Sequence, residues 1–212
     1  MKKILYVILH GSTNPDRYFN VKETWGKDVD CIFYSDHEDK EKNIIKVSDR
    51  TDYHSNEDKH VNVIKYLGEN INNYEWFFFC DDDTFVNTKK LEELSDNFDK
   101  NKVHGQMLKT DNSNGIPLPS PILEYCSGGA GYLIHNKILK IIKQNIRLLD
   151  TGYSDVTLGL ILRDLNILVS DSDYFKSQSP WFYGYTDEIM KNYISFHYVK
   201  TKNEMEHILN NI

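Results

Sequence analysis

Cysteine is scarce in this chain, and its placement argues against folds that disulfides or a structural zinc ion stabilise. The 212 residues contain three cysteines, Cys31, Cys80 and Cys126. An odd number at wide spacing fits neither a disulfide framework nor a zinc site. We therefore expect three core thiols in a protein of a reducing compartment.

Long apolar runs are also missing. Runs such as Ile4–Leu9 are the longest in the chain, whereas roughly 20 apolar residues are needed to span a bilayer. The same run is too short for a secretory signal peptide, and no small-residue cleavage site follows it. We expect a soluble, cytoplasmic protein without a membrane span.

Basic residues are too few to form a nucleic-acid-binding face. The chain has 25 Lys and Arg against 32 Asp and Glu, a net charge of −7, and its pI is about 5.6. Because nucleic-acid-binding proteins need a basic surface to neutralise phosphates, we expect no nucleic acid among the partners.

Two glycine motifs for phosphate binding are absent as well. The chain has neither the spaced glycines of a dinucleotide fingerprint nor the Gly-Lys-Ser/Thr of a P-loop. Both motifs use glycine to bring backbone N–H groups close to phosphates. Hydride transfer with a dinucleotide cofactor and P-loop hydrolysis are therefore disfavoured.

What the chain does contain is an alternation of strands and helices, which indicates an α/β fold. Its length suits one domain, residues 1–212, with enough material for a layered core. A stretch with three prolines, Thr110–Pro121, predicts a loop over a site. The patterns predict strands over 3–9, 31–34, 43–47, 76–80 and 104–108, and helices over 14–26, 56–70 and 89–98.

The most informative stretch is WFFFCDDDTFVN, residues 76–87, in which an apolar strand stops at three carboxylates, Asp81, Asp82 and Asp83. Ligands of open α/β sheets bind at the carboxyl ends of strands. Three adjacent like charges are best explained by a cation, together with phosphates, that neutralises them. A solvated turn is the alternative, although a turn favours Gly, Asn or Pro over a third Asp.

A glycine-rich turn follows later, in YCSGGAGYLI, residues 125–134. Gly128 and Gly129 let backbone approach a ligand closely. Glycine pairs also occur in many ordinary turns, so this motif alone leaves a structural role open.

Asp155 stands at the expected start of a helix, with Ser154 as its predicted cap. A carboxylate held there stays ionised near neutral pH and could accept a proton from an attacking hydroxyl. The alternative is an acid that only complements the helix dipole.

His197 lies among aromatic residues in SFHYVKTKNEM, residues 195–205. A lone histidine in an aromatic strand is often structural. It becomes a candidate ligand for a borderline cation such as manganese if it meets the aspartates in space.

Taken in order, these landmarks resemble the fringe and core-1 β-1,3-galactosyltransferase group of inverting, metal-dependent glycosyltransferases. The resemblance extends from Ile4 to His207 and includes Thr24-Trp25 at the end of the first helix. Each motif is modest, but five in register are specific. The other four matching segments are residues 76–84, 127–132, 154–159 and 195–199.

The resemblance implies a GT-A fold with a mixed central sheet flanked by helices, a UDP-sugar donor and a divalent ion, Mn2+ or Mg2+. It implies that Asp83 and His197 bind the metal directly. Asp81 and Asp82 would contact metal-bound water, ribose or the donor sugar, and Asp81 also counts among the metal ligands. Asp155 would be the catalytic base.

The same resemblance gives a set of donor-binding residues at the ends of early strands and in the glycine turn. The donor-binding residues are His10, Gly11, Ser35, Asp36, Lys59, Asp81, Asp82, Gly128 and Gly129. Ser12 belongs to the same strand end as His10. Trp181, Phe182 and Tyr183 are candidate surfaces for stacking against a sugar ring.

Two departures from the group stand out. Its members carry an acid before the aspartate of the fourth motif, where this chain has Ser154, so Asp155 is the only carboxylate there. Animal members also carry a membrane anchor, a stem and several disulfides, and we expect none of these features in this chain. We therefore expect a microbial or viral cytosolic enzyme instead of a Golgi one.

The expected function is transfer of a hexose or N-acetylhexosamine from a UDP-sugar to a sugar hydroxyl of a glycan or glycoprotein. One alternative is a catalytically silent UDP-sugar- or glycan-binding protein of the same fold. Another is an aspartate-nucleophile phosphatase. The latter favours Asp-x-Asp-x-Thr/Val on the first strand, whereas Phe85 occupies the fifth position here and the motif lies in mid-chain.

Overall fold

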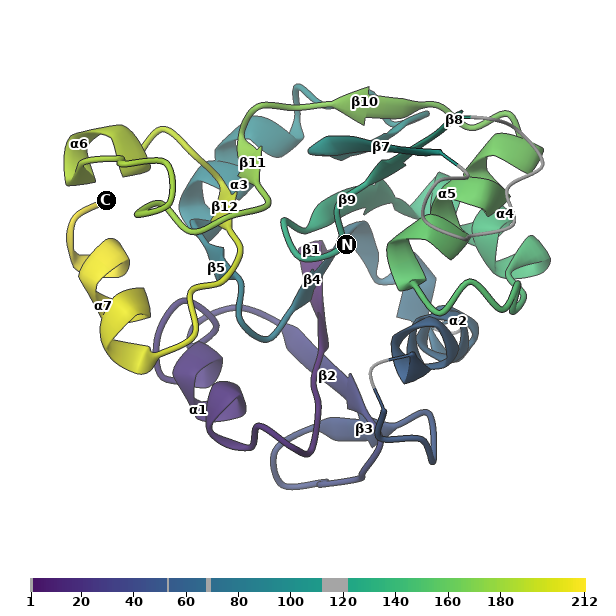
Figure 1. Cartoon of the computed structure of the whole chain (residues 1–212), viewed down its shortest axis with the longest axis horizontal. Helices are drawn as coiled ribbons and strands as arrows, with labels where there is room; N and C mark the ends of the chain where they lie inside the picture. The colour runs from purple at the N-terminus through teal and green to yellow at the C-terminus, as the bar shows by residue number, and fades with distance from the viewer. Residues whose placement is uncertain (1, 53, 68–69, 112–121) are drawn as a thin grey trace.

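A seven-stranded mixed sheet forms the centre of the computed structural model, which describes residues 2–52, 54–67, 70–111 and 122–212 (Figure 1). The strand order is β10-β6-β9-β4-β1-β2-β3. Strands β4, β1, β2 and β3 run parallel, whereas β9 is antiparallel to both β4 and β6. The strands are β1 (Lys2–Leu9), β2 (Cys31–Ser35), β3 (Ile44–Lys46), β4 (Tyr74–Asp81), β6 (Val103–Gly105), β9 (Tyr132–His135) and β10 (Val169–Asp171).

Strands β1 and β4 are central because both are almost continuously apolar. A strand covered on both faces needs such a run. Leu9 at the end of β1 is paired with Asp81 at the end of β4. His10 and the acidic triplet therefore leave the sheet at the same edge.

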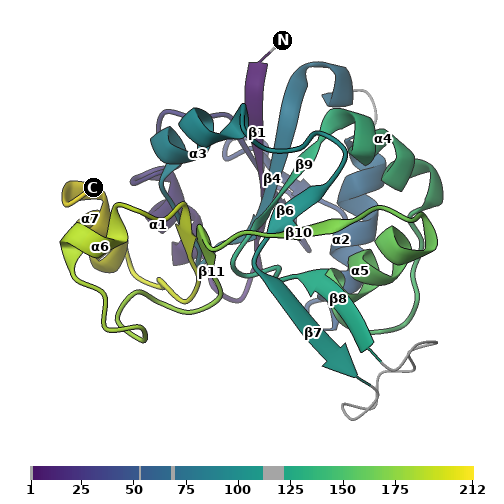
Figure 2. The same ribbon diagram turned by 90° about the horizontal axis from the view of Figure 1, so that it is seen from above.

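Helices cover both faces of the sheet, and Figure 2 shows the two layers on opposite sides of it. Alternate residues of β4 separate the two cores: Phe77 and Phe79 face one layer, and Trp76 and Phe78 face the other. The first layer contains α2 (Ser55–Tyr66), α4 (Asn136–Asn145) and α5 (Ser154–Asp164). The second contains α1 (Asp16–Lys22), α3 (Thr88–Ser95) and α7 (Lys202–Asn210).

Two small sheets accompany the main sheet. In one, β5 (Phe85–Val86) pairs antiparallel with β12 (Ser195–Phe196), which pairs with β11 (Phe175–Lys176). The other is the hairpin of β7 (Met107–Asp111) and β8 (Ile122–Cys126). The remaining short helices are η1 (Asn70–Asn72) and α6 (Asp187–Met190). Pairing of β5 with β12 brings the late aromatic segment back to the acidic triplet.

Most of the predicted elements are present, with several local differences. Helices α2 and α3 end at Tyr66 and Ser95, before the predicted ends at residues 70 and 98. The strand expected over residues 104–108 is two strands in different sheets, separated at Gln106. Helix α1 ends at Lys22, because the N–H groups of Thr24 and Gly26 both turn back to the carbonyl of Val21. Of the predicted loop, Thr110 and Asp111 belong to β7, and residues 112–121 lie outside the described residues.

The three cysteines are free thiols, as the sequence predicted. Cys80 and Cys126 are buried, Cys31 is partly buried, and all three are free. Across the ranges that the structure describes, no helix has the length and apolar character needed to cross a bilayer.

Candidate active site

The carboxyl edge of β4 brings two aspartates together with a histidine that lies more than 100 residues later in the sequence. The Nε2 atom of His197 lies 3.1 Å from Oδ1 of Asp83 and 3.6 Å from Oδ2 of Asp81. One ligand atom from each of the three residues falls within 4.8 Å of the others. His197 was a candidate metal ligand only if it lay close to the aspartates, and these distances meet that condition.

Backbone contacts hold His197 in this position. Its N–H donates to the carbonyl of Lys176 at 2.9 Å, and the N–H of Val199 donates to the carbonyl of Asp83 at 2.9 Å. The ring of Tyr198 stacks on the imidazole with centroids 3.8 Å apart. A Cβ on Gly129 would lie 2.1 Å from Cε1 of His197, so only glycine allows this approach.

The cluster gathers like charges, and their pKa values shift in response. Partial burial, together with the neighbouring carboxylates, raises the pKa of Asp81 to about 7. Burial also opposes ionisation of Asp83, but the hydrogen bond and charge of His197, with the charge of Arg17, lower its pKa overall. The pKa of His197 is raised because contact with the two carboxylates outweighs burial. A divalent ion would relieve the carboxylate repulsion, the physical requirement inferred from the sequence.

Asp82 is not part of this cluster and is held by His10 and Arg17. Its Oδ2 lies 2.7 Å from Nδ1 of His10, and its Oδ1 accepts a 3.0 Å hydrogen bond from Arg17 Nη1. The same Arg17 nitrogen lies 3.4 Å from Oδ2 of Asp83. These contacts tie the end of β1 and the start of α1 to the acidic triplet.

Asp155 lies in the first turn of α5, beside the glycine turn. Its Oδ2 accepts from the N–H of Gly128 at 3.1 Å, and its Oδ1 accepts from the N–H of Val156 at 2.9 Å. Burial raises the pKa of Asp155, and the backbone N–H groups offset only part of that rise. A raised pKa makes the carboxylate a stronger proton acceptor than one fully exposed at a helix end. Tyr153, not Ser154, occupies the N-cap position, and no side chain caps the helix.

The motif residues that carry no titratable group have a structural use, since they connect the segments of the site. Trp25 Nε1 donates to the carbonyl of Thr84 at 3.0 Å, and the Thr84 hydroxyl donates to the carbonyl of Gly129 at 2.7 Å. The Ser195 hydroxyl donates to the carbonyl of Ala130 at 2.5 Å. Helix α1, the acidic triplet, the glycine turn and β12 are thereby joined in the core.

The predicted nucleotide-binding residues gather at the ends of β1 and β2. Lys59 Nζ lies 3.1 Å from Oδ2 of Asp36, and both side chains are almost fully buried. The N–H of Ser12 and the hydroxyl of Ser35 each lie 3.3 Å from Oδ1 of Asp36. Burial alone would raise the pKa of Asp36, but hydrogen bonds from Ser12, Lys59 and His37, together with the Lys59 charge, lower it to about 2. Asp36 is therefore ionised throughout the neutral range.

The residues Asp81, Asp83 and His197 are called the metal-type cluster below. A cavity of about 380 Å3 lies between this cluster and Asp155. It unites most of the predicted catalytic and metal residues, but His10, Gly11, Ser35, Asp36, Lys59, Asp82 and Asp83 do not line it. Trp181 and Phe182 are exposed on a neighbouring loop and, like Tyr183, lie outside its lining. The cavity is lined by Asn56, Asp81, Leu108, Ser127, Gly128, Gly129, Gly152, Tyr153, Ser154, Asp155, Ser177, Gln178, His197 and Tyr198.

Some residues at the site carried no signal in the sequence. Arg17 is an ordinary helix residue until the fold brings it to Asp82 and Asp83. Asn56 of α2 and Gln178 of the loop after β11 also line the cavity. A search for polar residues in the first turn of helices that follow strands would have found Arg17 and Asn56, but it would not have distinguished them from solvated positions.

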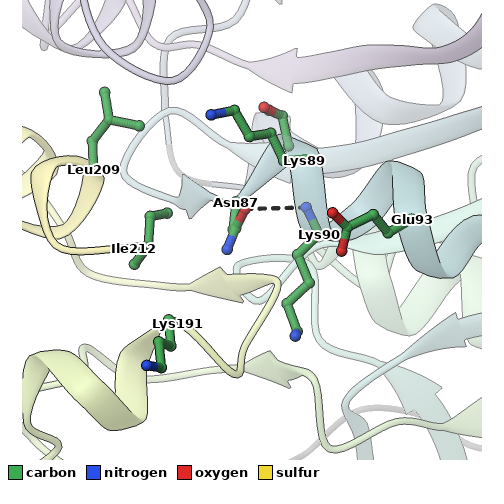
Figure 3. Close-up of a pocket in the computed structure, with 8 residues that line it drawn as sticks. Asn87, Lys89, Lys90, Glu93, Lys191, Leu209 and Ile212 are labelled. Carbon is green, nitrogen blue, oxygen red and sulfur yellow. Dashed lines mark hydrogen bonds between the residues drawn. The ribbon is translucent and has the colours of Figure 1, made fainter.

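A second cavity, of about 240 Å3, lies where the start of α3 meets the C-terminal segment (Figure 3). Lys89, Lys90 and Lys191 contribute to its wall, together with Glu93. Asn87 caps α3 there by accepting from the N–H of Lys90 at 3.1 Å. Lys191 is paired with Glu188. The two cavities share no lining residue.

Comparisons with known proteins agree with this geometry. The family model described as Fringe-like matches residues 13–211. A solved structure of a glycosyltransferase involved in the glycosylation of the major capsid of PBCV-1 is 17% identical, with a TM-score of 0.55 over 97% of this chain and 98% of that one. This likeness confirms the predicted GT-A type of mixed sheet flanked by helices. The galactosyltransferase LgtC with donor and acceptor sugar analogues gives 13% identity and a TM-score of 0.49, over 98% and 96% of the two chains.

Proposed function

The chain belongs to the Fringe-like family, and from this premise we propose that it is an inverting, metal-dependent glycosyltransferase that uses a UDP-sugar. The family and the fold support glycosyl transfer in general. The sugar would be a hexose or an N-acetylhexosamine, and the acceptor a hydroxyl of a glycan or glycoprotein. We propose a β-1,3-type linkage from the family resemblance alone.

One observation carries the proposal. Asp81 and His197 line the same cavity as Asp155, so a cation-binding cluster and a candidate base face one space. Transfer from a nucleotide-sugar needs both functions on opposite sides of the reacting carbon. A binding protein without catalysis would have no need for a carboxylate of raised pKa at that point.

The ligand atoms of the metal-type cluster suit a divalent cation. Asp81, Asp83 and His197 offer two carboxylates and one imidazole, which favours Mn2+ over Mg2+ because Mg2+ sites are built from oxygen ligands. A bound ion would supply positive charge for the diphosphate leaving group. The side chain of Asp81 is one-third exposed, so an ion can reach the cluster from the cavity.

Asp155 would act as the base. Its carboxylate would accept the proton of the acceptor hydroxyl while that oxygen bonds to the anomeric carbon and the bond from that carbon to the diphosphate breaks. This single in-line displacement inverts the configuration and releases UDP. The N–H groups of Gly128 and Val156 fix the orientation of the carboxylate before the acceptor binds.

The donor nucleotide would bind at the ends of β1 and β2, beside His10, Gly11, Ser35 and Asp36. The Lys59–Asp36 pair holds this region rigid, because both charges are buried and each satisfies the other. Gly128 and Gly129 would shape the sugar-binding wall of the cavity. Trp181, Phe182 and Tyr183 would contact more distant parts of the acceptor.

A titration with UDP in the presence and absence of Mn2+ tests the proposal. We expect UDP affinity to rise at least about tenfold with the ion, a coupling of about 1.4 kcal/mol. The Asp83→Ala variant should lose this gain. Equal UDP affinity with and without the ion in the wild-type protein would contradict a metal-dependent transferase.

A further inference from the structure

Glu57 is a buried carboxylate on the first turn of α2 that bonds to a segment about 90 residues later in the chain. Its Oε1 accepts from the N–H of Leu149 at 2.7 Å, and its Oε2 accepts from the N–H of Gly152 at 2.8 Å. Only 3% of its surface is exposed. Burying a carboxylate costs folding free energy unless its oxygens accept hydrogen bonds, and the N–H groups of Leu149 and Gly152 supply them here.

The clamped segment, residues 149–152, leads directly into the helix that carries Asp155. Its backbone is unusual, since Asp150 has φ of 57° and Gly152 has φ of 73°. A non-glycine residue in this region is strained and persists only where its surroundings hold it. A Cβ on Gly152 would lie 2.5 Å from Nδ1 of His54, so α2 and the residue before it enclose the segment.

Thr151 connects the clamp to α5. Its hydroxyl lies 3.5 Å from Oε2 of Glu57 and 2.7 Å from the hydroxyl of Thr157, and it accepts from the N–H of Tyr153 at 3.1 Å. Hydrogen bonds therefore join the segment, the N-cap residue and the first turns of α5 to Glu57. Asp155 follows the N-cap by two residues.

We propose that Glu57 is a positioning residue for the base Asp155, an inference that rests on the proposed transferase function. Glu57 fixes the entry of α5, and α5 presents the Asp155 carboxylate to the cavity. Gly152 and Tyr153 line that cavity themselves. Two residues further along α2, Lys59 holds Asp36, so one helix supports both the donor side and the base side of the site.

The test uses the substitution Glu57→Gln, with Asp58→Asn as a matched control. The new side-chain amide would turn an N–H2 donor toward a backbone N–H, so the clamp would lose one hydrogen bond and gain a repulsive contact. Asp58 lies on the same helix and bonds to Ser48 and Asn62 instead, so its change removes the same charge away from the cavity.

We expect Glu57→Gln to lower kcat about tenfold to hundredfold, as for a misplacement of about 1 Å. The donor KM and the UDP affinity should stay within about twofold. Asp58→Asn should keep kcat within about twofold, because neither Asp58 nor its partners Ser48 and Asn62 line the cavity. A Glu57→Gln variant with normal kcat, or one that loses kcat and UDP affinity together, would overturn the positioning role.

Amide hydrogen exchange gives a readout independent of activity. Leu149, Gly152 and the first turn of α5 should exchange at least about tenfold faster in Glu57→Gln than in the wild type, and remain protected in Asp58→Asn. Unchanged protection in Glu57→Gln would overturn the clamp. If the wild type turned over no donor, the transferase proposal would fail, and this exchange pattern would still decide whether the clamp exists.

Discussion

At the scale of single residues, Asp155 combines a fixed orientation with a raised pKa. Two backbone N–H groups hold its oxygens, and burial makes the carboxylate more basic than in water. Both properties serve proton acceptance from a hydroxyl. Neither is needed for binding a nucleotide.

The Asp155→Asn substitution separates these roles. The amide keeps the size of the side chain but cannot accept a proton, so transfer should fall by about a hundredfold to ten-thousandfold. UDP and metal affinity should remain nearly unchanged, because Asp155 lies outside the metal-type cluster. Steady-state kinetics and a UDP titration check both expectations. Near-normal turnover in this variant would remove Asp155 as the base.

His60 is a second residue with a measurable consequence, in this case for stability. It is 1% exposed, lies between the hydroxyls of Tyr34 and Tyr132, and burial lowers its pKa to about 4. Between about pH 4 and pH 6.5, the imidazole of His60 is protonated in the unfolded chain but neutral in the folded one. The stability due to His60 is therefore fully present above about pH 6.5 and is lost as the pH falls toward 4.

We expect this effect to cost about 2 kcal/mol of unfolding free energy between pH 7 and pH 5. Denaturant unfolding of the wild type and of His60→Gln at both pH values would show it as a difference in pH dependence. Parallel pH profiles for the two proteins would contradict the assignment.

At the scale of elements, the site depends on how closely the glycine turn and the segment after β12 approach each other. Gly129 permits the contact with His197, whereas a Cβ on Gly128 would meet Asp155 only at an ordinary 3.5 Å. Gly129→Ala should displace the imidazole and weaken Mn2+-linked UDP binding by at least about tenfold, because the loss of one ligand costs more than about 1.4 kcal/mol.

Gly128→Ala is the matched control for this prediction. It adds the same methyl group one residue earlier and retains the N–H that Asp155 accepts. Metal-linked UDP affinity, followed by calorimetry, should be reduced only in Gly129→Ala. Equal affinities in the two variants would show that the close approach to His197 does not matter.

The elements also show what the sequence could and could not predict. Strands β1 and β4 were predicted because their apolar runs are continuous. The hairpin partner β8 was not, since its buried and exposed positions are mixed and the neighbouring residues 112–121 carry three prolines. The cap of α5 was predicted wrongly, because the backbone of the clamped segment, and not a Ser154 hydroxyl, determines how that helix begins.

For the candidate site, the sequence predicted the residues better than their contacts. Asp81, Asp83 and His197 were expected to meet because motifs pointed to them. The bonds from Arg17 and His10 to Asp82, and from Glu57 to Leu149 and Gly152, depend on long-range packing that local patterns do not encode.

At the scale of the whole molecule, the strand order divides the site into two halves. The parallel strands β1 and β2 lead at their carboxyl ends into His10 and Asp36, which belong to the proposed donor-binding residues. The antiparallel strand β9 follows the glycine turn on the other side of β4. The acidic triplet lies at the boundary between these halves, where a donor and an acceptor could meet.

This division explains why one helix layer matters for both halves. Helix α2 packs against the strands and against α5 on the same face of the sheet (Figure 2). It therefore links the Lys59–Asp36 pair to the segment that carries Asp155. A change at Glu57 of α2 is therefore expected to affect catalysis, although this residue does not line the cavity.

The most direct test of the account is UDP release from a panel of UDP-sugars with Mn2+ and a mixture of glycan acceptors, for the wild type and Asp83→Ala. The account predicts metal-dependent turnover of one donor by the wild type, reduced at least about a hundredfold in the variant, as expected when a group that stabilises the leaving charge is lost. Turnover that is equal in the two proteins, or absent for every donor and acceptor, would contradict it.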